Sequence, residues 1–168
     1  MNAVIFIMGV ACSGKTTIGK LLSLRTGIPF FDGDGFHPLS NKEKMKAGIP
    51  LNDEDRQQWL HQLNTLAVEQ SKLKGAIIAC SALKEKYRNT LASGVRQPTW
   101  IFLQGDYELI YDRMNKRTHF MPVQLLRSQF DILEIPASAC TVDIKNDPGK
   151  IVEMIVQYLN NQQQSDKV

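Results

Sequence analysis

The stretch Gly9-Val10-Ala11-Cys12-Ser13-Gly14-Lys15-Thr16 matches the pattern G-x-x-x-x-G-K-[ST] at every defined position. An apolar run, residues 4–8, precedes it, and a helical pattern, residues 16–24, follows it. A glycine-rich loop between a buried strand and a helix turns successive backbone N–H groups toward a phosphate. We therefore predict that this loop and the adjoining Thr17 bind a nucleoside triphosphate, with Lys15 on its β- and γ-phosphates and Thr16 on Mg²⁺.

Outward from this loop, strand-length apolar runs alternate with helical patterns. The expected strands are residues 4–8, 29–31, 76–80, 100–103 and 140–144, and the expected helices are 16–24, 53–73, 107–114, 122–133 and 148–159. Such alternation favours right-handed βαβ units. It predicts an α/β protein with three layers, in which a five-stranded parallel sheet carries helices on both faces.

The domain organisation follows from the same pattern. We expect a single domain over residues 1–168, a lid inserted at about 115–139 and a frayed tail at about 160–168. The long helix after Asn52 is expected to end at Gly75. Its buried face should consist of apolar residues at helical spacing, namely Trp59, Leu60, Leu63, Leu66, Ala67 and Leu73.

The composition argues against several classes of protein. A net charge of +3 is small for a nucleic-acid binder, and the basic excess is confined to residues 84–127. The longest apolar run, residues 3–12, is too short to cross a membrane. Three cysteines, Cys12, Cys80 and Cys140, favour reduced thiols over a disulfide framework. We expect a cytoplasmic protein that binds neither nucleic acid nor membranes.

Two carboxylates follow the second expected strand, in Asp32-Gly33-Asp34. The third strand leads into Cys80-Ser81 and not into the aspartate that often assists the phosphate loop, so Asp32 is the best candidate to hold Mg²⁺ through water. In a parallel sheet both side chains should face the crevice at the carboxyl ends of the strands. Because phosphoryl transfer mainly requires an aligned acceptor hydroxyl, we predict that Asp34 orients or deprotonates it.

Further segments carry a family resemblance. They are Phe31 to Asp34 with His37-Pro38, Asn41, Lys44-Met45, Gly48, Pro50-Leu51, Asp53 to Arg56, Cys80 to Lys84 with Tyr87-Arg88, Arg117 to Met121, Leu125-Leu126, Ser128 to Phe130, and Leu133-Glu134 with Pro136. In this order they resemble the small, bacterial-type P-loop gluconokinases, whose fold is similar to that of nucleoside monophosphate and shikimate kinases. The sequence departs from that pattern at Ala11-Cys12, where Ser-Gly is more usual, and at Gln57-Gln58.

The resemblance implies an ATP-dependent kinase that phosphorylates the 6-hydroxyl of D-gluconate and forms a homodimer. Gluconate is a polyhydroxy acid, so its site should combine cations with hydrogen-bonding groups. The candidates are Arg56, Lys84 and Arg88, with His37 as a secondary one.

The basic pair Arg113 and Arg117, four residues apart, is expected to close over the phosphates, with Arg117 acting in catalysis. His119 and Gln129 are expected to line the lid.

Two other functions remain open at this point. A related small-molecule kinase, such as a shikimate kinase, would have a similar fold and similar paired acids. A non-catalytic ATP-binding switch would bind the nucleotide without acceptor-dependent turnover.

Overall fold

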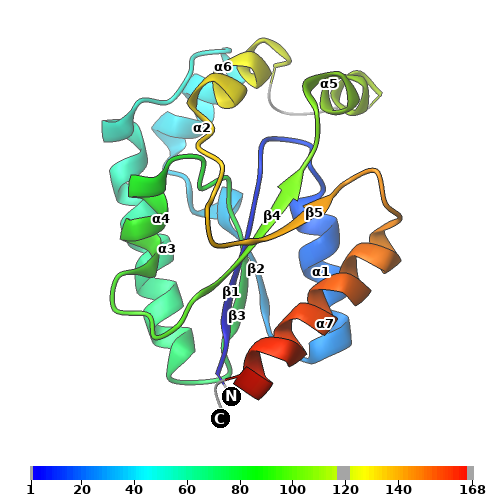
Figure 1. Cartoon of the computed structure of the whole chain (residues 1–168). Helices are drawn as coiled ribbons and strands as arrows, with labels where there is room; N and C mark the ends of the chain where they lie inside the picture. Colours follow the sequence, from blue (N-terminus) through cyan, green and yellow to red (C-terminus); the bar gives the residue numbers. More distant parts are fainter. Residues whose placement is uncertain (1, 117–121, 166–168) are drawn as a thin grey trace.

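The computed structural model describes residues 2–116 and 122–165, and it contains one parallel sheet. Within these ranges five strands lie in the order β2-β3-β1-β4-β5 (Figure 1). Their bounds are Val4–Met8 for β1, Phe30–Asp32 for β2, Ala76–Ala79 for β3, Thr99–Gln104 for β4 and Cys140–Asp143 for β5. The predicted fold class, with a five-stranded parallel sheet, is confirmed.

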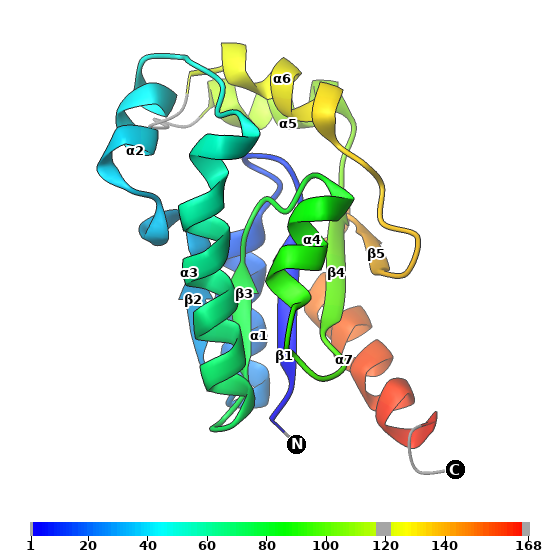
Figure 2. The same cartoon turned by 90° about the vertical axis from the view of Figure 1, so that its left-hand side faces the viewer.

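Helices cover both faces of this sheet. On one face lie α1 (Lys15–Thr26) and α7 (Pro148–Ser165), and on the other lie α3 (Asp53–Ser71) and α4 (Glu85–Ala92), as Figures 1 and 2 show together. Three further helices, α2 (Leu39–Lys46), α5 (Tyr107–Asn115) and α6 (Gln124–Ile132), lie beyond the carboxyl ends of the strands. A short 3-10 helix, η1 (Gly33–Phe36), follows β2.

The central strand β1 divides the core into two layers. Because alternate side chains of a strand point to opposite faces, Ile5 and Ile7 pack in one cluster and Phe6 and Met8 in the other. All five residues of β1 are buried. The first residue after this strand, Gly9, therefore starts its loop from a fixed point in the core.

The long helix α3 begins as the sequence predicts and ends earlier. The Asn52 side chain accepts from the Asp55 N–H at 2.8 Å, and the Asp55 carboxylate accepts from the Asn52 N–H at 3.0 Å, which forms a capping box. The helix stops at Ser71, so Leu73 lies outside it and is 63% exposed. The prediction that Leu73 belongs to the buried face is wrong, because the chain already turns toward Gly75, whose φ is +77°.

Other boundaries also differ from expectation. Helix α7 continues to Ser165, so residues 160–165 are helical where a frayed tail was expected. Helix α2 and the turn η1 were not predicted, because α2 is strongly polar and buries only Asn41 and Met45. The segment expected to act as a lid contains α6, and its role as a lid stays a prediction.

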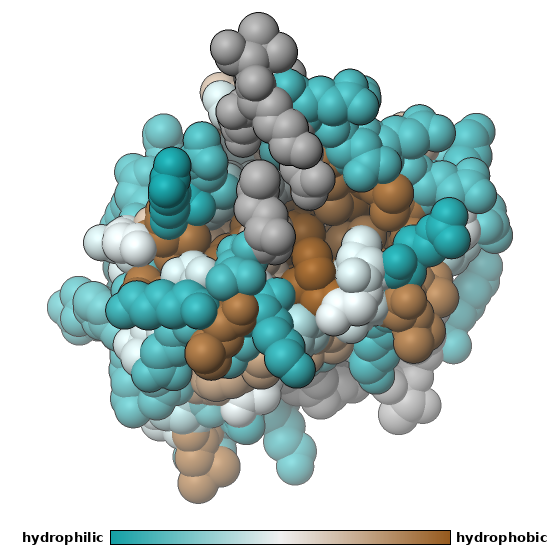
Figure 3. All heavy atoms as spheres, turned by 90° about the horizontal axis from the view of Figure 1, so that it is seen from below, coloured by the Kyte–Doolittle hydropathy of each residue, from teal (hydrophilic) through white to brown (hydrophobic). Residues whose placement is uncertain are grey.

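No helix among the described residues is both long and apolar enough to cross a bilayer. Seen from below, hydrophobic areas are interspersed with hydrophilic ones (Figure 3).

Candidate active site

The phosphate loop joins β1 to α1 in the strand–loop–helix arrangement that the sequence predicts. Gly9 has a φ of +150°, and a Cβ there would lie 2.9 Å from the Leu103 carbonyl oxygen. Gly14, at a φ of +100°, is the N-cap of α1 and gives that helix no side-chain cap. The first N–H groups of α1 are therefore left to bind an anion.

Lys15 is folded back onto this loop. Its Nζ donates to the carbonyl oxygens of Gly9 at 3.0 Å and Val10 at 2.8 Å. Burial lowers the pKa of the Lys15 ammonium, and the negative charge of Asp34 opposes that shift. The ammonium is thus held at the mouth of the loop, near the carboxylate that the sequence assigns to the acceptor.

The two predicted metal ligands meet at the start of α1. Thr16 Oγ1 donates to Asp32 Oδ2 at 2.9 Å, and the other Asp32 oxygen accepts from the Asp34 N–H at 3.1 Å. The second bond caps η1 and sets the direction of the chain that carries Asp34. One carboxylate therefore links the phosphate loop to the acceptor side.

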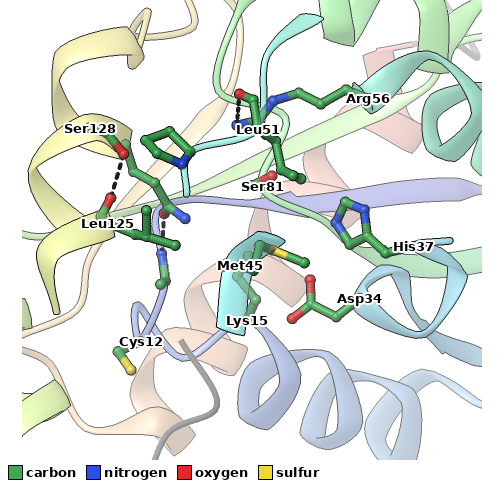
Figure 4. Close-up of a pocket in the computed structure, with 13 residues that line it drawn as sticks. Cys12, Lys15, Asp34, His37, Met45, Leu51, Arg56, Ser81, Leu125 and Ser128 are labelled. Atoms are coloured by element: carbon green, nitrogen blue, oxygen red, sulfur yellow. Dashed lines mark hydrogen bonds between the residues drawn. The ribbon is translucent and has the colours of Figure 1, made fainter. Parts of the chain in front are cut away.

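A pocket opens beside the loop, at the carboxyl ends of the strands (Figure 4). Its lining combines the phosphate loop, the turn after β2, α2, the chain before and at the start of α3, the segment after β3, and α6. The lining residues are Ala11, Cys12, Lys15, Asp34, His37, Met45, Pro50, Leu51, Arg56, Ser81, Leu125, Ser128 and Gln129. Four predicted substrate residues, Asp34, His37, Arg56 and Gln129, thus share one cavity.

His37 forms a rigid part of the pocket wall. Its ring stacks on Trp59 with centroids 4.4 Å apart and planes 10° from parallel, and Trp59 Nε1 donates to the Gly33 carbonyl oxygen at 2.7 Å. Burial, together with the positive charges of Arg56 and Lys42, lowers the pKa of His37 from 6.5 to about 4. The imidazole is therefore neutral at pH 7.

Arg56 is a buried cation whose hydrogen bonds are incomplete. Its side chain comes from the first turns of α3 and is 7% exposed. One Nη donates to the Leu51 carbonyl oxygen at 3.2 Å, and the guanidinium lies 5.4 Å from the centroid of the Tyr87 ring. Its Nε–H is buried and has no partner among the described residues. A donor of this kind suits an anionic ligand in the pocket.

Lys84 and Arg88 do not line the pocket. Lys84 donates to Asp53 at 3.0 Å, and Asp53 also accepts from Lys86 and from the Tyr87 hydroxyl. Hydrogen bonds from Lys86, Tyr87 and Lys84 hold the pKa of Asp53 well below its usual range. Lys84 is the N-cap of α4, and its contact with the substrate stays a prediction.

Arg88 is buried and has carbonyl partners instead. Its Nη1 donates to the carbonyl oxygens of Ala82 at 3.0 Å and Leu83 at 3.3 Å, which holds the segment between β3 and α4. Arg88 is absent from the pocket lining described above, and its contact with the substrate stays a prediction. An isolated i, i+4 pair in the sequence does not say which backbone groups lie within reach.

The lid candidates lie in different places. Gln129 Oε1 accepts from the Ala11 N–H at 2.8 Å and so docks α6 onto the phosphate loop. Arg113 donates to the Ile144 carbonyl oxygen at 2.7 Å and is absent from the pocket lining described above. Arg117 and His119 fall outside the described residues.

Several lining residues were not singled out as site residues from the sequence. Met45, Leu51 and Leu125 form a small apolar cluster with Ala11, and Ser81 and Ser128 add hydroxyls. Met45 and Leu51 belong to segments that the resemblance includes, which is the signal that could have located them. Their apolar character alone would have placed them in the core.

Comparison with known proteins gives a consistent picture. The family model described as shikimate kinase matches residues 11–139. The "Thermosensitive gluconokinase" of Escherichia coli (strain K12) is 43% identical over 157 residues, covering 90% of this chain and 84% of that protein. The "Gluconokinase" of Arabidopsis thaliana is 38% identical, covering 94% and 93%. The crystal structure of a gluconokinase from Sinorhizobium meliloti 1021 is 34% identical, with a TM-score of 0.89, covering 98% and 95%.

Proposed function

The chain belongs to the gluconokinase family, and we propose that it transfers the γ-phosphate of ATP to the 6-hydroxyl of D-gluconate, giving 6-phospho-D-gluconate. The observation that carries this proposal is the composition of the pocket. Its lining joins the phosphate-loop lysine Lys15, the carboxylate of Asp34 and Arg56, whose buried Nε–H has no partner within residues 2–116 and 122–165. A sugar acid needs all three: a phosphoryl donor, a partner for its hydroxyl and a cation for its carboxylate.

The donor side of the reaction uses the backbone of the loop. Residues 9–17, with the free N–H groups at the start of α1, would hold the β- and γ-phosphates of ATP, and Lys15 would stabilise charge on the transferring group. The γ-phosphate would then face the pocket that Lys15 and Asp34 both line. Binding and alignment supply most of the catalysis, because the transferring phosphoryl group makes few covalent demands on the protein.

The acceptor side uses side chains. Asp34 would accept a hydrogen bond from the 6-hydroxyl and take its proton as the bond to phosphorus forms. Arg56 would bind the gluconate carboxylate, since its Nε–H is already desolvated and has no partner in the part of the chain that the structure describes. His37 and Gln129 would contact the remaining hydroxyls. Lys84 and Arg88 would act indirectly, by holding Asp53 and the segment after β3.

Mg²⁺ fits the oxygen ligands beside the loop. The Thr16 hydroxyl and the Asp32 carboxylate lie 2.9 Å apart, and hard oxygen donors are what Mg²⁺ prefers. When bound, the ion would neutralise charge on the β- and γ-phosphates. We assign Thr16 as the direct ligand and Asp32 as the ligand through water.

Further features belong to the same proposal. Arg113 and Arg117 would approach the phosphates, and His119 the acceptor, when α6 and the segment before it close over the site. A homodimer in the cytoplasm completes the proposed description. Light scattering of the purified protein and fractionation of its host would test these two points.

An acceptor scan tests the activity. ADP release is measured with gluconate, other aldonates, shikimate and nucleoside monophosphates, each at the same ATP and Mg²⁺ concentrations. We expect turnover with gluconate, and turnover that depends on shikimate alone would favour the second candidate, which the matching shikimate kinase model suggests. ATP binding with no acceptor-dependent turnover would favour a nucleotide switch instead.

A further inference from the structure

The protonated nitrogen of His37 is fixed by a neighbour that does not line the pocket. His37 Nδ1 lies 3.3 Å from Nδ2 of Asn41, a residue of α2 that is 2% exposed. The same Asn41 nitrogen donates to the backbone carbonyl oxygen of Asp55 at 2.7 Å. An amide NH₂ has two hydrogens and accepts none, so it donates one hydrogen to each partner.

The orientation of this amide is locked by the Asp55 carbonyl. If the amide were turned over, its oxygen would lie against the Asp55 oxygen, and two acceptors at that distance repel each other. The NH₂ group therefore faces both partners. It follows that His37 Nδ1 carries a lone pair, and that the hydrogen of the neutral ring is on Nε2.

The position of the ring is fixed as firmly as its tautomer. Stacking on Trp59 sets the plane of the imidazole, and Trp59 is itself held by its hydrogen bond to Gly33. The positive charge of Arg56, which lines the same pocket, disfavours protonation of the neutral ring to an imidazolium. Nε2 has no hydrogen-bond partner within residues 2–116 and 122–165, whereas the ring borders the cavity beside Asp34 (Figure 4).

We propose that Asn41 is a positioning residue that holds His37 as the Nε2–H tautomer, so that His37 donates to a hydroxyl oxygen of the acceptor and takes no proton from it. The acceptor hydroxyl that receives this bond is one that does not react, and the reacting hydroxyl is left to Asp34. The inference rests on the proposed function for the identity of the acceptor as a polyhydroxy acid. The tautomer itself rests only on the contacts of Asn41 and His37.

The tautomer is measured first, without any substrate. Imidazole ¹⁵N spectra of the histidine-labelled full chain are recorded at pH 7, and the His37→Gln variant assigns the His37 signals. We expect a protonated Nε2 and an unprotonated Nδ1. A protonated Nδ1, or a doubly protonated ring at this pH, would overturn the proposal.

Variants of Asn41 then test whether this residue holds His37 as the Nε2–H tautomer. Asn41→Asp offers Nδ1 a carboxylate, which accepts a hydrogen, so Nδ1 should become protonated. Asn41→Leu adds no buried charge and serves if the first variant does not fold. It should show signal from both tautomers, and a spectrum unchanged from the parent would contradict the role of Asn41.

Kinetics connect the tautomer to the acceptor. His37→Phe keeps the stacked ring and removes the N–H, so KM for gluconate should rise about tenfold, as expected for one lost hydrogen bond. KM for ATP should stay the same, and His37→Gln, which restores a donor, should recover part of the loss. Asn41→Leu should resemble His37→Phe. An unchanged KM for gluconate in His37→Phe would contradict the proposal.

Asn64→Leu is the matched control. Asn64 also donates from one amide nitrogen to two carbonyl oxygens, those of Leu91 at 3.0 Å and Ser93 at 2.7 Å, and it does not line the pocket. This variant should lose stability without a change in KM for gluconate. If Asn41→Leu and Asn64→Leu changed the KM values for gluconate and for ATP to the same extent, the role of Asn41 would be structural only. If no variant and no parent protein turned over gluconate, the proposed function would be wrong, and the spectra would still decide the tautomer.

Discussion

The phosphate loop and the acceptor wall of the pocket do their work with different atoms. The loop presents backbone N–H groups, and its shape follows from glycines at positive φ and from the bonds of Lys15 to Gly9 and Val10. The wall presents side chains, chiefly Asp34, His37 and Arg56. Eight consecutive residues therefore specify the loop, whereas the wall depends on segments brought together by folding.

Two buried arginines, Arg56 and Arg88, also differ in role, although they are the same residue type. Arg56 and Arg88 are both 7% exposed, and both bond to backbone carbonyl oxygens. Arg88 uses one nitrogen to hold two carbonyls of the segment after β3, whereas Arg56 lines the pocket and keeps a buried Nε–H that no described residue accepts. Burial of a charge is thus no guide to its role until its hydrogen bonds have been counted.

The largest expected effect is on the loop side. Lys15→Ala removes the cation that faces the transferring phosphate, so kcat should fall by at least about 10³-fold and ATP should bind more weakly. Coupled ADP release and nucleotide titration measure the two effects. Lys20→Ala, an exposed position on the same helix, is the control and should leave both unchanged. Near-normal turnover in Lys15→Ala would contradict the assignment of the loop.

Asp34→Asn should affect the acceptor wall and leave ATP binding by the phosphate loop intact. The variant loses the carboxylate that aligns the acceptor hydroxyl, so kcat should fall by about 10²- to 10³-fold while ATP affinity is preserved. Rapid-quench measurement of phosphoryl transfer and ATP titration are the readouts, with the exposed Asp131→Asn as control. A parallel loss of ATP affinity would mean that Asp34 belongs to the donor side.

The acceptor wall should also make stability depend on pH. His37 has a pKa of about 4 in the folded protein and about 6.5 when unfolded, so between these values only the unfolded chain is protonated. The contribution of His37 is complete above about pH 6.5. It is lost as the pH falls toward 4, which lowers the free energy of unfolding by up to about 3 kcal/mol. Urea unfolding of the parent and of His37→Gln at several pH values measures this contribution. If the free energy of unfolding depended on pH identically in the two proteins, the prediction would be wrong.

The two arginines give a matched pair of smaller effects. Arg56 lines the pocket, and Arg56→Lys cannot reproduce its guanidinium N–H groups, so KM for gluconate should rise by about 10- to 100-fold. Arg88→Lys should lower the free energy of unfolding by about 1–3 kcal/mol and leave KM unchanged. Steady-state kinetics and urea unfolding of both variants test the pair. The reverse pattern would show that Arg88, and not Arg56, binds the substrate.

The smallest effect is expected at Cys12, inside the loop. Its φ of +57° favours glycine, but glycine costs more conformational entropy on folding, so Cys12→Gly should change the free energy of unfolding by no more than about 1 kcal/mol. ATP affinity should be preserved, because this position contributes its N–H and not its side chain. A large loss of affinity in a titration would show that the thiol takes part in binding.

Much of the fold could be predicted because its signals are local. The apolar run of β1, the cap at Asn52 and the glycines of the loop each act over a few residues, and each lies where it was expected. The end of α3 and helix α2 were missed. Leu73 continues the apolar periodicity past the last helical turn, and α2 has too few apolar residues to show any periodicity.

The candidate site divides in the same way. The sequence by itself determined the phosphate loop and the succession along the chain of the strands and of the helices other than α2, since backbone conformation and periodic burial are properties of neighbouring residues. Only the tertiary structure decided that Gln129 reaches the N–H of Ala11 across 118 positions, that Arg56 rather than Arg88 lines the pocket, and that Asn41 holds His37. The physical reason is that a side chain's role depends on the partners within hydrogen-bond distance, and folding chooses those partners.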